Sequence, residues 1–218
     1  MGATQVASQP FYRGAEADLS LSLEYPWKAV VKHRISKKYR HSALDEKLMR
    51  ERTLSESSII HEAKKAGVHV PSIIKIDSES NTIVMTHVPG KVARETLDSM
   101  SRSQAKNFFR SLGNQVGKLH AAGIVHGDLT TSNIIVTSSG EPFIVDFGMS
   151  RRSIEPEDRG VDLHLLQRSI TASHITSMVT LISSLIDGYR EGAGEKLANS
   201  TWAKAREISR RGRYYAIR

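Results

Sequence analysis

Apolar and polar positions change their spacing several times along the chain, and each spacing predicts a different element. Residues 9–34 are expected to form strands, because small or apolar residues alternate with polar ones over 17–23 and the β-branched pair Val30–Val31 follows. Residues 42–66 have the composition of a helix, which Gly67 ends. Two short β-rich runs, 73–76 and 82–86, follow and are joined by a polar turn.

The clearest helical pattern covers residues 101–122. Its apolar side chains recur at steps of three and four and form one stripe for burial, consisting of Ala105, Phe108, Phe109, Leu112, Val116 and Leu119. Ser101 is the expected N-cap, and Gly113 and Gly117 are expected to permit close packing. Runs 134–136 and 143–145 predict a hairpin. Residues 157–211 are expected to be mostly helical, with an interruption at 188–194.

The order of these elements indicates an α+β protein with a mainly β first half and a mainly α second half. The 218 residues allow one large domain or two small lobes. No apolar run approaches the length of a membrane span, and the N-terminus lacks the pattern of a signal peptide. Cysteine is absent, which excludes disulfides and thiol catalysis. A cytoplasmic protein without membrane contact is therefore expected.

Charge adds a prediction about partners. The net charge is +8, which favours a polyanionic partner such as nucleic acid or an acidic protein surface. Basic side chains gather at 28–41 and again at 202–218, where Arg210, Arg211 and Arg213 precede two adjacent tyrosines. We expect this terminal segment to lie beyond the last helix and to contact nucleic acid or a partner protein. A solvated, frayed terminus is the alternative, and the sequence does not decide between them.

The strongest chemical signal is the sequence H-G-D-L-T-T-S-N at 126–133, followed by D-F-G at 146–148. Phosphoryl transfer requires a divalent metal, oxygen ligands for that metal and a carboxylate near the attacking hydroxyl. Asp146 and Asn133 could hold the metal, and Asp128 could orient the nucleophile or accept its proton. Each residue alone is better explained as a turn former, but their joint spacing favours the catalytic interpretation.

These residues resemble the catalytic loop and the D-F-G motif of protein kinases. More closely, the chain resembles the small kinase-like ATPase subunit of the KEOPS complex, which belongs to the p53-related protein kinase-like family. The KEOPS complex makes threonylcarbamoyladenosine on tRNA. The resemblance also rests on G-A-E-A at 14–17, V-K-H-R at 31–34, K-Y-R-H at 38–41, R-T-L-S-E at 52–56, V-D-L at 161–163 and R-G-R at 211–213. It implies a bilobal protein-kinase-like fold with a β-rich N-lobe at 1–88 and a reduced helical C-lobe at 89–218.

The resemblance also implies an ATP site. Lys32 would contact the α- and β-phosphates and Glu56 would pair with it, although other glutamates share the same helical region. Met85 and Val88 would belong to the link between the lobes that binds adenine through its backbone, and Gly14 is what remains of the glycine-rich loop. The implied cofactors are ATP with Mg²⁺ or Mn²⁺. Other KEOPS subunits are the implied partners, including the catalytic threonylcarbamoyltransferase subunit, with tRNA bound through the complex.

Several departures from the kinase pattern limit the expected activity. Gly127 replaces the arginine that would pair with a phosphorylated activation loop, and no A-P-E sequence follows Gly148. Thr130 stands where Ser/Thr kinases usually have a lysine. We therefore expect ATP hydrolysis and Ser/Thr kinase activity, with poor phosphorylation of unrelated proteins. His126 and Asp162 are expected to hold the catalytic loop by hydrogen bonds, without a role in the chemistry.

Two other functions remain open from the sequence. A small-molecule phosphotransferase of the aminoglycoside or choline kinase type would share the loop, but it would have a larger substrate-binding region after Asp146 than this chain has. A pseudokinase scaffold is the second alternative, against which stand the intact residues of the site. In a eukaryote the nucleus would also be a compatible location.

Overall fold

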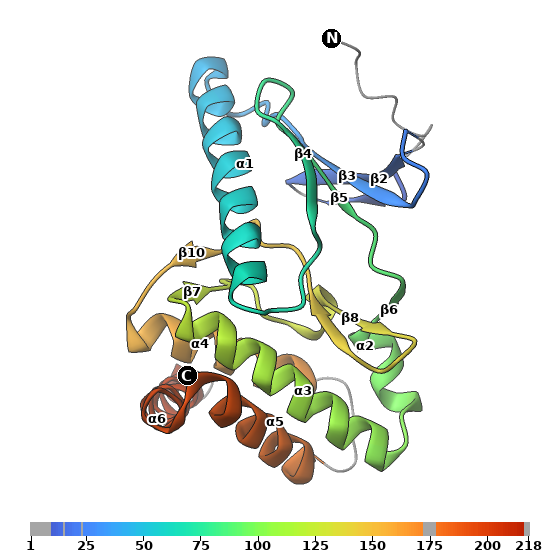
Figure 1. The fold of residues 1–218 in the computed structure, drawn as a ribbon. Helices are drawn as coiled ribbons and strands as arrows, with labels where there is room; N and C mark the ends of the chain where they lie inside the picture. The colour runs from blue at the N-terminus through green and yellow to red at the C-terminus, as the bar shows by residue number, and fades with distance from the viewer. Residues whose placement is uncertain (1–9, 15, 23, 172–177, 216–218) are drawn as a thin grey trace. The chain divides into compact units, whose positions relative to one another are not determined.

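The computed structural model describes residues 10–14, 16–22, 24–171 and 178–215, with only the backbone described at 178–180 and 212–215. The described residues divide into two compact units (Figure 1). The first contains the chain up to His61 together with Pro71–His87. The second contains Glu62–Val70 and the chain from Val88 onward.

The first unit is built on an antiparallel sheet with the strand order β1-β2-β3-β5-β4. Its strands are β1 (Tyr12–Arg13), β2 (Ala17–Ser22), β3 (Ala29–Arg34), β4 (Ile73–Asp77) and β5 (Thr82–Thr86). Side chains alternate between the two faces of β3. Ala29 and Val31 form a buried cluster with Val84. Lys32 and Arg34 lie on the opposite face, toward α1 (Ser42–Lys65), where Glu56 contacts both.

The second unit combines short strands with helices (Figure 1). The strands are β6 (Gly90–Val92), β8 (Ile134–Thr137) and β9 (Pro142–Ile144) in one antiparallel sheet, and β7 (Ile124–Val125) with β10 (Arg151–Arg152) in another. The helical segments are α2 (Ala93–Thr96), η1 (Leu97–Ser99), α3 (Arg102–Ala121), η2 (Thr131–Asn133), α4 (Pro156–Thr171), α5 (Met178–Ala193) and α6 (Glu195–Tyr215). The predicted hairpin of β8 and β9 is therefore confirmed, as is the α+β class.

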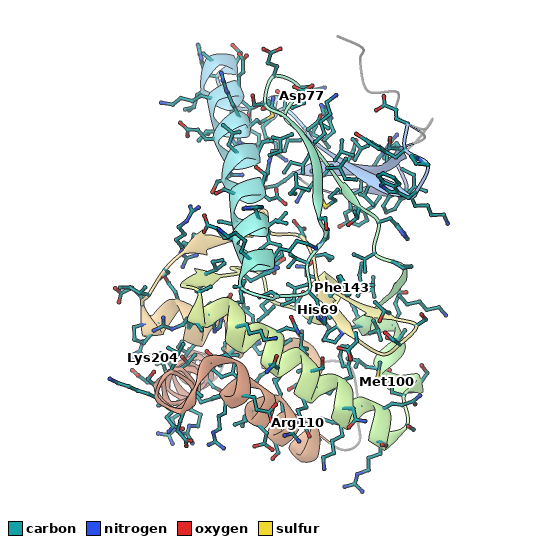
Figure 2. The ribbon with its side chains drawn as sticks, viewed as in Figure 1. His69, Asp77, Met100, Arg110, Phe143 and Lys204 are labelled. Atoms are coloured by element: carbon teal, nitrogen blue, oxygen red, sulfur yellow. The ribbon has the colours of Figure 1, made fainter. Side chains whose placement is uncertain are left out.

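The segment Glu62–Val70 is attached to the second unit around His69. The His69 backbone N–H donates to Gln115 Oε1 at 2.7 Å, and its carbonyl accepts from Ile144 N at 2.9 Å. The imidazole stacks on Phe143 at 5.2 Å between ring centroids, and both residues are labelled in Figure 2. These contacts tie the segment to α3 and to the end of β9, next to the D-F-G sequence.

Helix α3 begins where the sequence predicted. Ser101 and Gln104 form a capping box, in which each side chain accepts from the other residue's backbone N–H. The predicted apolar stripe is buried along its whole length. The stripe supplies a rigid, buried support for the loop that follows the helix.

Four glycines let α3 and α5 approach closely, as predicted for Gly113 and Gly117. A Cβ at Gly113 would lie 2.1 Å from the carbonyl oxygen of Leu185, and one at Gly117 would lie 2.5 Å from that of Tyr189. Gly188 and Gly192 on α5 are equally close to backbone oxygens of α3. The predicted interruption at 188–194 is therefore confined to its last residue. α5 continues to Ala193, and only Gly194, at φ +79°, breaks the helix.

The prediction of a terminal segment beyond the last helix is wrong for most of its length. α6 continues through Gly212 to Tyr215, so the backbone of Arg210, Arg211 and Arg213 is helical. Arg211 forms ion pairs with Glu157 of α4 and with Glu207 one turn earlier. Packing of α6 against α4 outweighs the weak helix propensity of glycine at this position. None of the helices in the described residues has the length and apolarity that crossing a bilayer requires.

Candidate active site

The loop between β7 and β8 brings Asp128 and Asn133 together. Asn133 Nδ2 donates to the Asp128 carbonyl oxygen and to its carboxylate Oδ2, both at 2.9 Å. The single turn η2 supplies the curvature that allows residues five apart to meet. Both side chains remain partly accessible, while Leu129 and Thr131 beneath them are buried. The loop therefore has a buried anchor and a polar outer edge.

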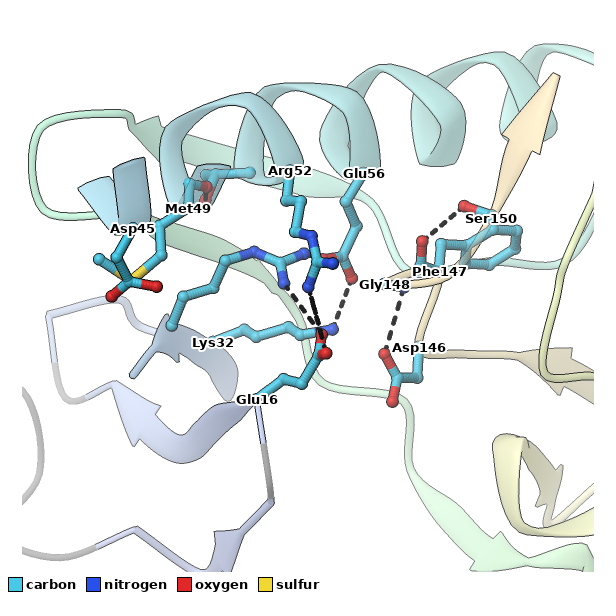
Figure 3. Close-up of polar contacts among 12 residues, drawn as sticks. Glu16, Lys32, Asp45, Met49, Arg52, Glu56, Asp146, Phe147, Gly148 and Ser150 are labelled. Carbon is cyan, nitrogen blue, oxygen red and sulfur yellow. Dashed lines mark hydrogen bonds and ion pairs between the residues drawn. The ribbon is translucent and has the colours of Figure 1, made fainter. Parts of the chain in front are cut away.

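Asp146 lies beside this loop, at the end of β9. The Val145 backbone N–H donates to the Asn133 carbonyl oxygen at 3.0 Å, which extends the β8–β9 pairing up to Asp146. Asp146 adopts φ +61°, a left-handed conformation that aspartate tolerates better than most residues. Gly148 N donates to Asp146 Oδ1 at 3.3 Å (Figure 3). The exposed carboxylate of Asp146 thus follows a fixed strand end.

Asp162 on α4 holds the backbone at the start of the 126–133 loop. Its Oδ2 accepts the backbone N–H of His126 at 2.6 Å, and its Oδ1 accepts that of Gly127 at 2.8 Å. Burial by itself raises the pKa of Asp162, but hydrogen bonds from His120 and the charge interactions with His120 and His126 outweigh it, so the pKa lies below the ordinary value. The carboxylate is ionised and fully engaged, so its predicted bracing role is confirmed.

A buried chain of hydrogen bonds continues from Asp162 to α3 and α5. His120 Nε2 lies 3.2 Å from Asp162 Oδ2, and His120 Nδ1 lies 2.9 Å from the Tyr189 hydroxyl. Burial raises the pKa of Tyr189 to about 12, so the phenol keeps its proton and can donate to Nδ1. His120 can then donate from Nε2 to Asp162. Three helices thereby hold one carboxylate in place.

His126 holds the loop through both ring nitrogens. Asp128 N donates to Nδ1 at 3.3 Å, so Nε2 carries the proton and donates to the Val145 carbonyl oxygen at 3.0 Å. The ring also packs against buried Phe147, at 4.9 Å between centroids. His126 links the Asp128 loop to the segment before Asp146, as expected for a residue that holds the backbone.

The first unit contains the expected lysine–glutamate pair. Lys32 Nζ donates to Glu56 Oε1 at 2.6 Å, between β3 and α1 (Figure 3). Glu56 Oε2 also accepts from Arg34 Nη2. Near these residues, Arg52 Nη1 donates to both carboxylate oxygens of Glu16 at 3.1 Å. Glu56, rather than another glutamate of the helix, is therefore the partner of Lys32.

The other residues predicted to contact the nucleotide, Met85, Val88 and Gly14, lie in three different parts of the chain. Met85 is buried in β5, where it pairs with Val30 and Ile73. Val88 is buried at the start of the second unit's long segment. Gly14 lies between β1 and β2, and its N–H donates to the Ala17 carbonyl oxygen at 3.0 Å. The roles of these three residues in adenine and phosphate binding stay predictions.

The residues Asn133 and Asp146 fit a hard divalent metal by their chemistry. Asn133 Nδ2 is fixed by two acceptors on Asp128, so its Oδ1 is oriented away from that residue and stays available as a ligand. Mg²⁺ prefers one or two protein oxygens together with phosphate and water oxygens. No cluster of three or more His, Cys, Asp or Glu side chains suited to a metal occurs among the described residues.

Three residues of these networks have no role in the sequence-based predictions. Arg34 occurs in a quoted motif, and its spacing of two from Lys32 on a strand could have placed it on the same face. His120 and Tyr189 had no such signal, because a histidine at the end of a helix and a tyrosine within another do not indicate that they meet. Only the packing of α3 against α5 brings them together.

The RIO domain family matches residues 25–171 of this chain. The KEOPS complex subunit Bud32 of Pyrococcus abyssi is 40% identical over 208 residues, covering 93% of this chain and 94% of the relative. The EKC/KEOPS complex subunit bud32 of Dictyostelium discoideum is 36% identical, covering 81% of this chain and 72% of the relative.

Longer proteins and a solved structure are also similar to the chain. A probable bifunctional tRNA threonylcarbamoyladenosine biosynthesis protein of Methanococcus maripaludis is 37% identical, and the chain spans only 35% of its length. The crystal structure of the Rio2 kinase from Chaetomium thermophilum has a TM-score of 0.65 at 21% identity, covering 94% of this chain and 73% of that one. This last similarity concerns the fold, which is that of an atypical kinase.

Proposed function

This chain belongs to the RIO-domain family, and on that premise we propose that it is an atypical kinase that binds ATP with Mg²⁺ and hydrolyses it. We further propose that it acts as a subunit of a KEOPS complex, in formation of threonylcarbamoyladenosine on tRNA. Similarity over nearly the full length of the Pyrococcus abyssi Bud32 supports that partnership. Family membership favours this proposal over the small-molecule phosphotransferase considered above.

One observation supports the chemistry most strongly. The Asp128 carboxylate accepts a hydrogen bond from the Asn133 amide, whose oxygen is left available. A backbone hydrogen bond joins Asn133 to Val145, the residue before Asp146. The three side chains thus form one arrangement held by buried groups. Buried Asp162 accepts the backbone N–H groups of His126 and Gly127, which keeps the loop in place.

Each residue has a defined task in the proposed reaction. Asn133 and Asp146 would hold Mg²⁺, which when bound neutralises phosphate charge. Lys32, oriented by Glu56, would contact the phosphate oxygens. Asp128 would accept the proton of the attacking water or hydroxyl while the oxygen of that water or hydroxyl forms a bond to the γ-phosphorus. The bond between that phosphorus and the ADP oxygen then breaks, and ADP leaves with the electron pair.

The basic residues of α6 have a smaller part in this proposal than the sequence implied. Arg211 is already paired with two glutamates, so it would have to leave them to contact RNA. Arg210 is exposed on the same helix, while the side chain of Arg213 is not described. A contribution of this helix to tRNA or partner binding stays a prediction, as does a cytoplasmic location.

The proposal is tested by ATP turnover of the purified chain. Hydrolysis is measured with Mg²⁺, with Mn²⁺ and with a chelator, first alone and then with the other KEOPS subunits and tRNA. We expect metal-dependent hydrolysis that the partners and tRNA increase. Absence of ATP binding and of hydrolysis in every combination would refute the proposed activity. Hydrolysis that the partners leave unchanged would refute only the coupling to the complex.

A further inference from the structure

Helix α4 contacts the 126–133 loop at two separate places. Asp162 accepts two backbone N–H groups at the start of the loop. Seven residues later on the same helix, Ser169 Oγ accepts the backbone N–H of Thr131 at 3.1 Å. This second contact lies near the other end of the loop, where the single turn η2 leads to Asn133.

The spacing of the two side chains on α4 explains why one helix reaches both ends of the loop. Seven residues are nearly two full helical turns, so Asp162 and Ser169 lie on the same face, roughly 10 Å apart along the helix axis. Leu166 lies between them and is fully buried, so this face of the helix packs into the unit. The helix thus presents two hydrogen-bond acceptors to the loop at a fixed separation.

The hydroxyl of Ser169 caps η2 from outside the turn's own sequence. The first N–H groups of a helical turn have no partner within the turn. Thr130 occupies the N-cap position of η2, but its side chain makes no capping hydrogen bond. Because Thr131 is only 2% exposed, its N–H requires an acceptor from the protein. Ser169 Oγ is that acceptor.

The position of the Ser169 oxygen is fixed by its own helix. Ser169 Oγ donates to the Leu166 carbonyl oxygen at 2.8 Å, a bond within the helix that holds the side-chain rotamer. The lone pairs of the same oxygen accept the N–H of Thr131. Removing the hydroxyl would therefore leave a buried backbone donor without its acceptor at the first residue of η2.

The capped turn determines where the amide of Asn133 lies. Asn133 N donates to the Thr130 carbonyl oxygen at 3.0 Å, which closes η2. Asn133 Nδ2 donates to two oxygens of Asp128, so the amide plane is fixed from the other side. The remaining amide oxygen, Oδ1, is the atom proposed above to hold the metal. A shift of the turn at Thr131 would move that oxygen.

We propose that Ser169 is a positioning residue for the metal ligand Asn133. Its hydroxyl caps η2, and the capped turn holds the amide oxygen of Asn133 in place for Mg²⁺. Asp162 holds the half of the loop that carries Asp128, so the two acceptors of α4 serve different halves of the site. This proposal rests on the proposed binding of ATP with Mg²⁺, which it extends to a side chain outside the reacting groups.

The test compares the metal dependence of Ser169→Ala with that of the wild type. ATP turnover is measured over a range of Mg²⁺ concentrations. Mn²⁺ affinity is measured separately by electron paramagnetic resonance, in the presence of a non-hydrolysable ATP analogue. Ser169→Ala should need about three- to tenfold more metal in both measurements, the scale of one hydrogen bond. Its affinity for the nucleotide without metal should change less than about twofold.

Ser200→Ala is the matched control. Ser200 Oγ donates to the Leu197 carbonyl oxygen at 2.9 Å, the same kind of bond within a helix, but at an exposed position of α6. Its metal dependence should match that of the wild type within about twofold. A wild type that neither binds nor hydrolyses ATP refutes the proposed function. An active wild type, with Ser169→Ala needing no more metal than Ser200→Ala, overturns the role of Ser169.

A second measurement follows the hydrogen bond itself and does not depend on activity. Amide hydrogen exchange is measured by NMR at Thr131, with Gly127 as the internal reference. Both amides should be protected in the wild type, because both donate to side chains of α4. In Ser169→Ala, exchange at Thr131 should become at least about tenfold faster while exchange at Gly127 stays unchanged. Equal exchange at Thr131 in the two proteins would overturn the proposal. An unprotected Thr131 amide in the wild type would also overturn it, even if Ser169→Ala does not fold.

Discussion

The buried carboxylate of Asp162 offers a severe test of how the catalytic loop is held. The substitution Asp162→Asn keeps the shape of the side chain but replaces one acceptor oxygen by an NH₂ donor. The wild-type carboxylate accepts from His126 N, Gly127 N and His120 Nε2. With asparagine, at least one of these donors faces another donor in a site that water does not reach.

The magnitude follows from these contacts. One buried donor without a partner costs about 1–3 kcal/mol, and loss of charge assistance weakens the remaining bonds, giving about 2–4 kcal/mol in the free energy of unfolding. For a chain of this length that corresponds to a fall in Tm of about 5–15 °C. Asp158→Asn is the matched control, because Asp158 lies one turn earlier on α4 and pairs with exposed Arg151. Its Tm should fall by less than about 4 °C.

The same carboxylate predicts a dependence of stability on pH. The folded pKa of Asp162 is lowered, so its stabilisation is fully present above the ordinary aspartate value of about 3.9 and is lost as pH falls through the lower folded pKa. Thermal unfolding is measured from neutral to acid pH. The wild type should lose stability below that ordinary value more steeply than Asp162→Asn. Equal Tm values at neutral pH, or parallel acid profiles, would refute the bracing role of Asp162.

Three further predictions concern packing and chemistry. Gly188→Ala should lower the free energy of unfolding, measured in urea, by about 1–3 kcal/mol, because its Cβ would lie 1.8 Å from the Arg110 carbonyl oxygen, although alanine favours helices. Ser183→Ala on the same helix is the control and should change that free energy by less than about 0.5 kcal/mol. Equal stability of both variants would refute the close approach of the two helices. Asp128→Ala should slow ATP turnover by roughly 10²–10⁴-fold in single-turnover assays with ATP affinity nearly unchanged; parallel loss of affinity and rate would make Asp128 a binding residue. Autophosphorylation should exceed phosphorylation of unrelated peptides, since α4 begins at Pro156, soon after Gly148, and leaves little chain for docking a peptide; rapid phosphorylation of such peptides would contradict this.

The fold was largely predictable because periodic burial determines it. The stripe on α3 and its cap at Ser101 required no knowledge of distant residues. The two errors both concerned glycine, at Gly188 and at Gly212. In isolation each weakens a helix, but Gly188 is where α5 meets the backbone of α3, and Gly212 lies in a helix that packs on α4. Tertiary contacts outweighed local propensity in both cases.

The candidate site was predictable in its chemistry and less so in its support. Asp128 and Asn133 are five residues apart, so their meeting follows from a short loop. The partner of Lys32 was chosen by resemblance, since spacing alone did not separate Glu56 from its neighbours. The chain from Asp162 through His120 to Tyr189 joins three helices distant in sequence. No local pattern encodes such a contact, which only the packed structure brings together.

Mg²⁺-dependent ATP hydrolysis by Asp146→Ala tests the central claim most directly. Turnover of this variant is compared with that of the wild type and of Asp98→Ala, which removes an exposed carboxylate in Leu97–Ser99. Asp146 is also exposed, and its left-handed backbone costs alanine only about 1–2 kcal/mol, so both variants should fold with Tm values within about 8 °C of the wild type. The account predicts loss of metal-dependent hydrolysis in Asp146→Ala and normal turnover in Asp98→Ala. Near-normal hydrolysis by a folded Asp146→Ala protein would contradict it.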